Sequence, residues 1–180
     1  MDINQLIRDD LSRYEVLTVW LKLFHISLRR AQYSKNPLAR KFYSALFSLL
    51  RRQQHMLIWP EGKIGRGLCM IHAFGAGVNS AAVLGDNVTL HQFVAIGQEN
   101  RGKRQGAPVL GNRVWVGPGA VVVGRVNIGD DVLIAPNSYV NCDVPSHSIV
   151  MGNPCRIIPR ENATEGYITF PVPEGEADEE

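Results

Sequence analysis

The sequence predicts an all-β solenoid with an N-terminal α-helical region, and three observations lead to this fold class. Apolar residues recur every six positions through the C-terminal two-thirds of the chain, a period that fits neither a helix nor an alternating strand. All 17 glycines except Gly166 and Gly175 fall between Gly62 and Gly152. Residues 1–56, by contrast, contain one proline and no glycine, and their apolar residues follow a helical spacing.

Residues 1–56 are predicted to form helices. Apolar residues recur there at steps of three and four, as on one face of an amphipathic helix: Leu17, Trp20, Leu21, Phe24 and Leu28. Asn36 and Pro37 then suit the N-cap and the first residue of a further helix, which we expect to continue through Phe42 to Leu50.

Residues 57–160 form the predicted β-helix. The longest unbroken run of the six-residue period comprises Leu110, Val116, Val122, Ile128, Ile134 and Val140. One short strand and one corner for each hexad, with three hexads to a coil, give a triangular solenoid. The apolar residue fills the interior, and the small residue that often follows it permits the corner. Between Met70 and Val78 the step is eight residues, so the register slips by two.

Two segments depart from the period. The step from Ile96 to Leu110 is fourteen residues, which predicts an excursion loop at residues 98–108, polar and basic at Arg101, Lys103 and Arg104. Insertions in a solenoid gather on its functional face. The tail, residues 161–180, loses the period, and its acidic end is predicted to be disordered.

Composition excludes several classes of protein. A net charge of +2, without a repeated basic and aromatic pattern, gives no reason to expect nucleic acid binding. Three cysteines without CxxC spacing suggest neither a disulfide framework nor a zinc site. The sequence contains no signal peptide and no apolar stretch long enough to span a bilayer. We therefore expect a cytoplasmic protein with reduced thiols.

The segments GRGLCMIHAFGAGV, LGDNVTLHQFVAIGQ and DVPSHSIVMGNPCRII resemble the serine acetyltransferase branch of the hexapeptide-repeat acyltransferases. The resemblance covers about residues 57–160. The excursion GQENRGKRQGAP and the later EGYI are more similar still to a subset found among genes for surface-polysaccharide assembly. The resemblance implies a left-handed parallel β-helix, a homotrimer, and acetyl-CoA as co-substrate in a groove between subunits, with no metal required.

His72 is the candidate general base. Acetyl transfer from a thioester to a hydroxyl needs a base for the alcohol proton and donors for the oxyanion, and histidine, with a pKa of about 6.5, suits the first task. His72 lies where the register slips, and the resemblance implies that it is the catalytic histidine. The structural alternative is a corner histidine bonded to a backbone carbonyl. No Ser-His-Asp set is visible, which favours direct attack.

The resemblance also implies a set of residues that contact the coenzyme: Trp115, Gly117, Ala135, Pro136, Asn141, Arg156 and Arg160. Each has a structural alternative: coil packing for the tryptophan, corner geometry for the small residues, and a solvated edge for the arginines. The candidate substrate residues are His91, Asn79, Arg101 and Lys103. His91 could line the acceptor pocket or polarise His72, but a surface or stacking role is equally open.

Three departures from the family pattern bear on the acceptor. Leu57 and Ile71 occupy positions of acids, and Ala107 occupies the position of a second histidine. A zwitterion without partner charges is costly to bury, so the sequence favours a saccharide hydroxyl over free L-serine, in polysaccharide or glycolipid assembly, with peripheral membrane contact through a lipid-linked substrate. The alternatives are serine O-acetyltransferase of cysteine biosynthesis and a non-catalytic trimeric scaffold. A metal-dependent hydrolase is less favoured, because zinc sites need at least three protein ligands.

Overall fold

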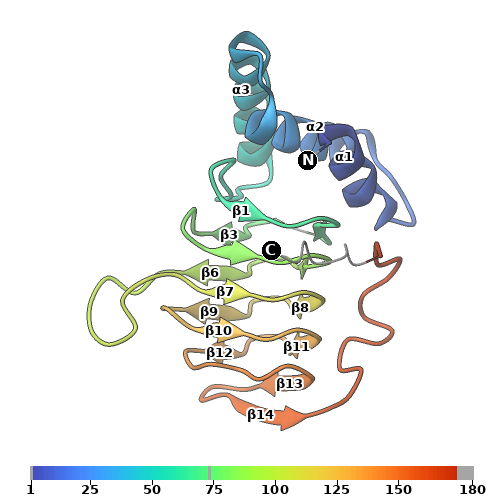
Figure 1. Cartoon of the computed structure of the whole chain (residues 1–180). Helices are drawn as coiled ribbons and strands as arrows, with labels where there is room; N and C mark the ends of the chain where they lie inside the picture. Colours follow the sequence, from blue (N-terminus) through green and yellow to red (C-terminus); the bar gives the residue numbers. More distant parts are fainter. Residues whose placement is uncertain (1, 73, 174–180) are drawn as a thin grey trace, which may run out of the picture.

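The computed structural model describes residues 2–72 and 74–173. Three helices lie at one end of a prism of short strands (Figure 1). They are α1 (Ile3–Ser12), α2 (Val19–Tyr33) and α3 (Pro37–Gln53). Within these described ranges, no helix is long and apolar enough to cross a membrane. The acidic residues 174–180, predicted to be disordered, lie outside the described part of the chain.

The strands form three sheets, each on one side of the prism. Sheet 1 holds β1 (Lys63–Ile64), β4 (Val83–Leu84), β7 (Val109–Leu110) and β10 (Asn127–Ile128). Sheet 2 holds β2 (Cys69–Met70), β5 (Thr89–Leu90), β8 (Val114–Val116), β11 (Val132–Ile134), β13 (Ser148–Met151) and β14 (Arg156–Pro159). Sheet 3 holds β3 (Gly77–Val78), β6 (Ala95–Gly97), β9 (Val121–Val123) and β12 (Tyr139–Val140).

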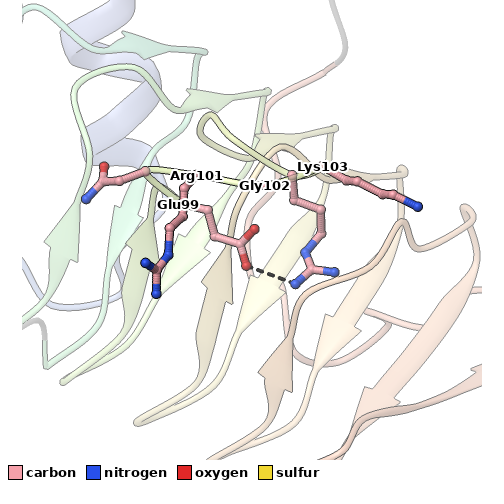
Figure 2. A pocket seen from close by; sticks show the side chains of 6 residues that line it. Glu99, Arg101, Gly102 and Lys103 are labelled. Atoms are coloured by element: carbon pink, nitrogen blue, oxygen red, sulfur yellow. Dashed lines mark hydrogen bonds and ion pairs between the residues drawn. The ribbon is translucent and has the colours of Figure 1, made fainter.

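Up to β12, each strand pairs in parallel with the third strand after it, as β1 does with β4 and β4 with β7. Three strands therefore complete one turn of a triangular coil, as the six-residue period predicts. The β13–β14 pair at the far end is antiparallel. The excursion loop leaves the coil between β6 and β7 (Figures 1 and 2), on the segment that the fourteen-residue step predicts.

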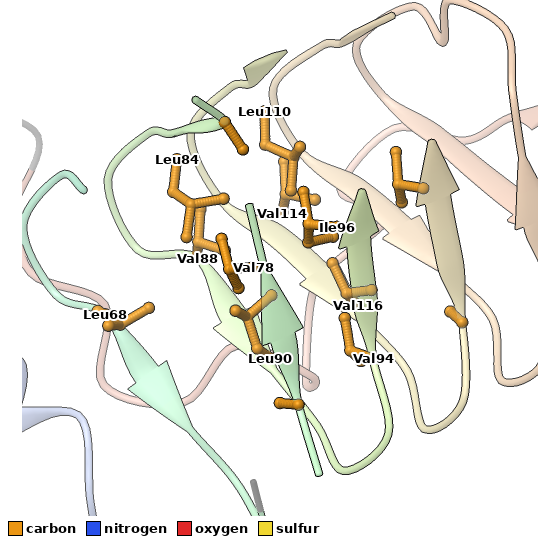
Figure 3. Close-up of a cluster of buried hydrophobic side chains, with 14 of the residues drawn as sticks. Leu68, Val78, Leu84, Val88, Leu90, Val94, Ile96, Leu110, Val114 and Val116 are labelled. Carbon is orange, nitrogen blue, oxygen red and sulfur yellow. The ribbon is translucent and has the colours of Figure 1, made fainter. Parts of the chain in front are cut away.

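The residues of the six-residue period fill the interior of the prism (Figure 3). Those of the longest run are at most 2% exposed. Side chains from successive coils pack on one another and form one continuous apolar column that includes Leu84, Leu90 and Ile96. Burial of about 25 cal/mol for each Å² of apolar surface makes this column the main source of stability.

The sequence predicts that the glycines after the sheet 1 strands permit the corners, but the structure gives them a different role. A Cβ on Gly85 would lie 2.5 Å from the carbonyl oxygen of Gly111, and one on Gly129 would lie 2.4 Å from the backbone nitrogen of Ser146. These glycines thus allow successive coils to approach each other. The left-handed backbone of this corner falls two residues later, at Asn87 (φ 59°) and its counterparts in the other coils.

The N-terminal helices begin at side-chain caps. Asn36 Oδ1 accepts hydrogen bonds from the backbone nitrogens of Leu38 (2.9 Å) and Ala39 (3.2 Å), which confirms the predicted N-cap. Helix α2 begins after Thr18, whose hydroxyl caps it. Leu17 therefore precedes the helix and is 37% exposed, so its predicted place on the apolar face is wrong.

A buried polar network joins the helices to the first coil. The Asp10 carboxylate accepts from Arg29 Nε (2.7 Å), Arg29 Nη2 (2.9 Å) and the Leu68 backbone nitrogen (3.0 Å). His25 Nδ1 lies 3.2 Å from Asp10, and His25 Nε2 lies 2.8 Å from the Tyr14 hydroxyl. That hydroxyl accepts from the nitrogen of Met70 at 2.6 Å, two residues before His72.

The tail returns along sheet 2 toward the helices (Figure 1). Asp131 holds its start, because its carboxylate accepts from the backbone nitrogens of Ala163 (2.9 Å) and Thr164 (3.0 Å). The side chain of Asn87 exchanges two hydrogen bonds with the backbone of Val172, at 2.8 and 2.9 Å. This segment covers the outer face of sheet 2 and buries Trp115 to 7% exposure.

Candidate active site

The corner between sheets 2 and 3 contains two extra residues in the first coil. The nitrogen of Gly119 donates to the carbonyl of Gln92 in the preceding coil (2.9 Å). In the same way, the nitrogen of Phe93 donates to the carbonyl of Phe74, which lies one coil before Phe93 (3.0 Å). Phe74 and Gln92 are therefore equivalent positions. The two extra residues come just before Phe74, and His72 is one of them.

This insertion displaces His72 outward from the regular corner. The residue has a left-handed backbone, with φ of 48°, and its side chain is exposed. Side chains rarely adopt this conformation without a structural or functional reason. Among the described residues, the imidazole has no hydrogen-bond or ion-pair partner. It is free to approach a ligand.

His91 lies at the same corner in the following coil. Its ring is 4.7 Å from the Trp115 ring, and its Nε2 is buried without a hydrogen-bond partner among the described residues. Oε1 of the neighbouring Gln92 is also buried without a partner there. Burial, and secondly the proximity of His72, lower the pKa of His91 by more than the adjacent Gln92 side chain raises it, so the imidazole is neutral at pH 7. A neutral imidazole can donate or accept one further hydrogen bond.

The corner continues downward from His91 through two predicted coenzyme residues. The nitrogen of Gly117 donates to Ile134 in the next coil (2.9 Å), and that of Ala135 donates to Val150 (2.8 Å). With about 4.8 Å between coils, Ala135 lies about 10 Å below His91. We call this line the corner strip, and it comprises His72, His91, Gly117, Ala135 and Pro136.

The structure does not bring every candidate residue to this strip. Asn79 and Asn141 follow β3 and β12, at the opposite edge of sheet 3. Arg156 pairs with Met151 at the lower end of the strip, whereas the nitrogen of Arg160 donates to the carbonyl of His147 (2.7 Å) at another corner. Four residue steps, about 13 Å of extended chain, separate the two arginines.

Two predicted coenzyme residues are enclosed. Trp115 lies under the tail, with its ring 5.1 Å from that of Tyr167. Gly117 is buried, and a Cβ there would lie 2.7 Å from the Trp115 ring. Packing thus accounts for the small residue at position 117 and for the indole beside it.

The excursion loop forms a charged hollow of about 930 Å³. Its walls are the six residues from Glu99 to Arg104, of which Glu99 and Arg104 form an ion pair at 2.9 Å (Figure 2). Arg101 and Lys103 are exposed, and within the described chain their side chains have no hydrogen-bond or ion-pair partner. The loop therefore offers two uncommitted cations next to one carboxylate.

Comparison with known proteins identifies the chain. Residues 107–142 match the bacterial transferase hexapeptide family (six repeats). Serine acetyltransferase of Helicobacter pylori is 34% identical over 153 residues, which cover 83% of this chain and 88% of the relative. The chain belongs to the serine acetyltransferase family. It is therefore an enzyme, an acyltransferase. The serine acetyltransferase of Staphylococcus aureus is 32% identical over 161 residues, covering 86% of this chain and 73% of the relative.

Solved serine acetyltransferase structures share the fold. The enzyme of Neisseria gonorrhoeae in complex with serine has a TM-score of 0.65 and 26% identity, and the match covers 87% of this chain and 69% of that one. The enzyme of Brucella abortus in complex with coenzyme A has a TM-score of 0.71 and 28% identity, with 88% and 67% covered. Each match covers more of the chain than the β-helix and the tail together, so it includes part of the helical region.

The saccharide acceptor predicted from the sequence is wrong. Relatives at 34% and 32% identity are serine acetyltransferases, and they support neither a polysaccharide or glycolipid substrate nor contact with a membrane. The prediction relied on the absence of polar side chains at Leu57, Ile71 and Ala107. It counted these three losses against L-serine and gave less weight to charges elsewhere in the fold, such as the Glu99 carboxylate of the excursion loop.

Gln92 stands out already in the repeat. The later coils have Pro118 and Pro136 at its position, so a glutamine there stands out from the repeat.

The described residues contain no group of three or more His, Cys, Asp or Glu side chains that could hold a metal ion. The Asp86 carboxylate is not part of this site, because it accepts from the nitrogen of Arg66 (2.7 Å) at a different corner.

Proposed function

We propose that the protein transfers the acetyl group of acetyl-CoA to the hydroxyl of L-serine, and that His72 is the general base. One observation carries this proposal: in a member of the serine acetyltransferase family, the two-residue insertion exposes a histidine beside a second, neutral one. The complexes of the relatives with serine and with coenzyme A support the two substrates. We further propose the family's left-handed coil.

The proposed reaction is direct attack without an acyl-enzyme. His72 removes the proton from the serine hydroxyl as the oxygen attacks the thioester carbonyl. The tetrahedral intermediate collapses, the carbon–sulfur bond breaks, and the coenzyme thiolate leaves with a proton returned by the imidazole. Backbone N–H groups would stabilise the oxyanion, because fixed donors need no reorganisation.

The charges that serine requires come, in this proposal, from the excursion loop. Serine carries an ammonium and a carboxylate, and Leu57, Ile71 and Ala107 provide no charge for either. Glu99 is suited to the ammonium, while Arg101 and Lys103 are suited to the carboxylate. His91, Gln92 and Asn79 would add neutral hydrogen bonds, since His91 and Gln92 each have a buried polar atom without a partner in the described structure.

The coenzyme is proposed to follow the corner strip. Ala135 and Pro136 leave the strip open for the pantetheine arm, and Arg156 lies at its lower end, where a phosphate would be paired. Trp115 and Gly117 would support the strip from beneath. Asn141 and Arg160 are at other corners. Their proposed contacts therefore require either coenzyme atoms that extend beyond the strip or a coenzyme bound at the strip of a second subunit.

A homotrimer would complete this site. The strip and the excursion loop lie at opposite edges of sheet 3, and the five residue steps from Gln92 to Gly97 span about 16 Å. One serine molecule cannot bridge that distance within a single subunit. We therefore propose that the loop of one subunit covers the strip of its neighbour. Sedimentation of a fully active monomer would contradict this arrangement.

The test is acetyl transfer by the purified protein. Release of the coenzyme thiol from acetyl-CoA should depend on L-serine, and mass spectrometry should identify O-acetylserine. His72→Asn, which suits the left-handed backbone, should lower the rate at least about a hundredfold. His147→Asn replaces another histidine with a left-handed backbone, φ 57°, at a different corner, and should keep the activity. Absence of serine-dependent turnover in the wild-type protein would refute the proposal and favour a scaffold.

A further inference from the structure

Two cysteines far apart in the sequence meet at the lower end of the β-helix. Cys142 follows β12 and Cys155 precedes β14, and their sulfur atoms are 3.9 Å apart. Cys142 is exposed, and Cys155 is half-buried at the edge of the apolar column. The third cysteine, Cys69, is buried in β2 of the first coil. The pair is thus separate from the corner strip and accessible to small reagents.

We propose that Cys142 and Cys155 are a redox modification site that forms a reversible intramolecular disulfide. The sulfurs are already in contact, and bond formation at 2.05 Å requires them to approach by about 1.9 Å. The bond would close a loop between residues that lie 13 positions apart. Because no CxxC motif is present, only the winding of the last coil brings these thiols together.

The chemistry requires a disulfide oxidant such as oxidised glutathione. The thiolate of one cysteine attacks the oxidant and releases one reduced glutathione, which leaves a mixed disulfide. The second thiolate then attacks that sulfur, forms the protein disulfide and releases the second glutathione. Two electrons pass from the two cysteines to the oxidant, and the two thiol protons end on the two glutathione molecules.

The surroundings make the reaction dependent on pH. Burial, then the contact with Cys155 and the charge of Asp143, raise the pKa of Cys142 above its usual value, and the opposing charge of Arg104 is the smallest influence. Since the thiolate is the reactive form, the pair should be stable to weak oxidation near neutral pH and should react faster in alkaline solution. A metal-binding role is not favoured, because the described residues provide no third ligand of the Cys, His, Asp or Glu type.

The disulfide would connect two segments next to proposed coenzyme contacts. Cys155 immediately precedes Arg156, and Cys142 immediately follows Asn141. Closure would pull the turn before β14, a strand paired on one side alone in the described chain, toward the end of β12. If the proposed function holds, this shift of Arg156 should raise the KM for acetyl-CoA several-fold while kcat changes little.

The experiment counts thiols in the wild-type protein. After equilibration with mixtures of reduced and oxidised glutathione, the protein is acid-quenched, denatured and titrated. Three thiols are expected under reducing conditions and one, that of Cys69, under oxidising conditions. Peptide mapping should find Cys142 joined to Cys155. Cys142→Ser and Cys155→Ser are matched controls, because each keeps one member of the pair and should yield a glutathione adduct on it.

Three results would overturn the proposal: three free thiols at every glutathione ratio, separate glutathione adducts on both cysteines, or a disulfide between two chains. Each would mean that the two sulfurs do not join within one chain. The KM measurement is independent of this outcome. A disulfide that forms without any effect on acetyl-CoA would leave the redox site intact and would instead contradict the proposed contact of Arg156.

Discussion

Replacing Asp10 by asparagine should loosen the helices from the β-helix. The Asp10 side chain is 0% exposed and is the carboxylate that pairs with Arg29, whose side chain is also 0% exposed. Asparagine has nearly the same shape but no charge. It leaves the Arg29 guanidinium buried without its counterion, although Ile64 O still accepts from Nη1 at 2.9 Å.

The expected loss follows from this uncompensated charge. Breaking a buried ion pair by removing one partner costs about 3–5 kcal/mol. For a protein of this size each kcal/mol corresponds to about 2–4 °C, so the unfolding temperature of the helical region should fall by about 6–20 °C. Hydrogen exchange should quicken in α1, α2 and the amide of Met70, which the Tyr14 hydroxyl now protects.

Asp9→Asn provides the matched control. Asp9, whose side chain is 6% exposed, pairs with Arg66 at 2.8 Å, but the Arg66 guanidinium that the substitution would leave unpaired belongs to a side chain that is 29% exposed. Water can replace that contact, so the loss should stay within about 1 kcal/mol. Circular dichroism at the helix band and hydrogen exchange would compare the two variants. Equal losses in both, or a loss below about 1 kcal/mol in Asp10→Asn, would refute the reasoning.

The same network predicts sensitivity to acid. Burial by itself raises the pKa of Asp10, but hydrogen bonds from His25 and Arg29 outweigh it and hold the pKa below the ordinary 3.8. A depressed pKa contributes stability that is fully present above the unfolded value, and this stability is lost as the pH falls through the folded value. The helices should therefore remain docked at pH 5 and detach below about pH 4.

Three further predictions concern the coil and its tail. Gly85→Ala places a Cβ 2.5 Å from a backbone oxygen, so denaturant unfolding should show a loss of about 1–3 kcal/mol. Burial raises the pKa of Asp131, but hydrogen bonds from Thr164, His147 and Ala163 lower it overall. Acid should therefore release the tail and change the fluorescence of Trp115 as the pH falls below about 4. Asp131→Asn should show the released signal already at pH 7, and an unchanged spectrum would contradict this role of Asp131.

The sequence alone was sufficient for the repeating part of the fold. Each coil repeats the same local contacts, so a period of six, the slip of two residues before Val78 and the fourteen-residue step predict the strands, the deformed corner and the excursion loop. The cap at Asn36 is likewise local, because its side chain bonds to residues two and three positions later. Handedness, trimer formation and the residue roles at the site came from resemblance and stay proposals.

Tertiary structure decided whatever depends on contacts between distant segments. The Asp10–Arg29 pair, the return of the tail over Trp115 and the meeting of Cys142 with Cys155 join residues that no periodicity relates. Substrate preference was misjudged because single positions such as Leu57 were compared one at a time. The charges of the excursion loop follow β6, at the opposite edge of sheet 3 from His72, so the subunit packing that we propose is what brings them to the same acceptor.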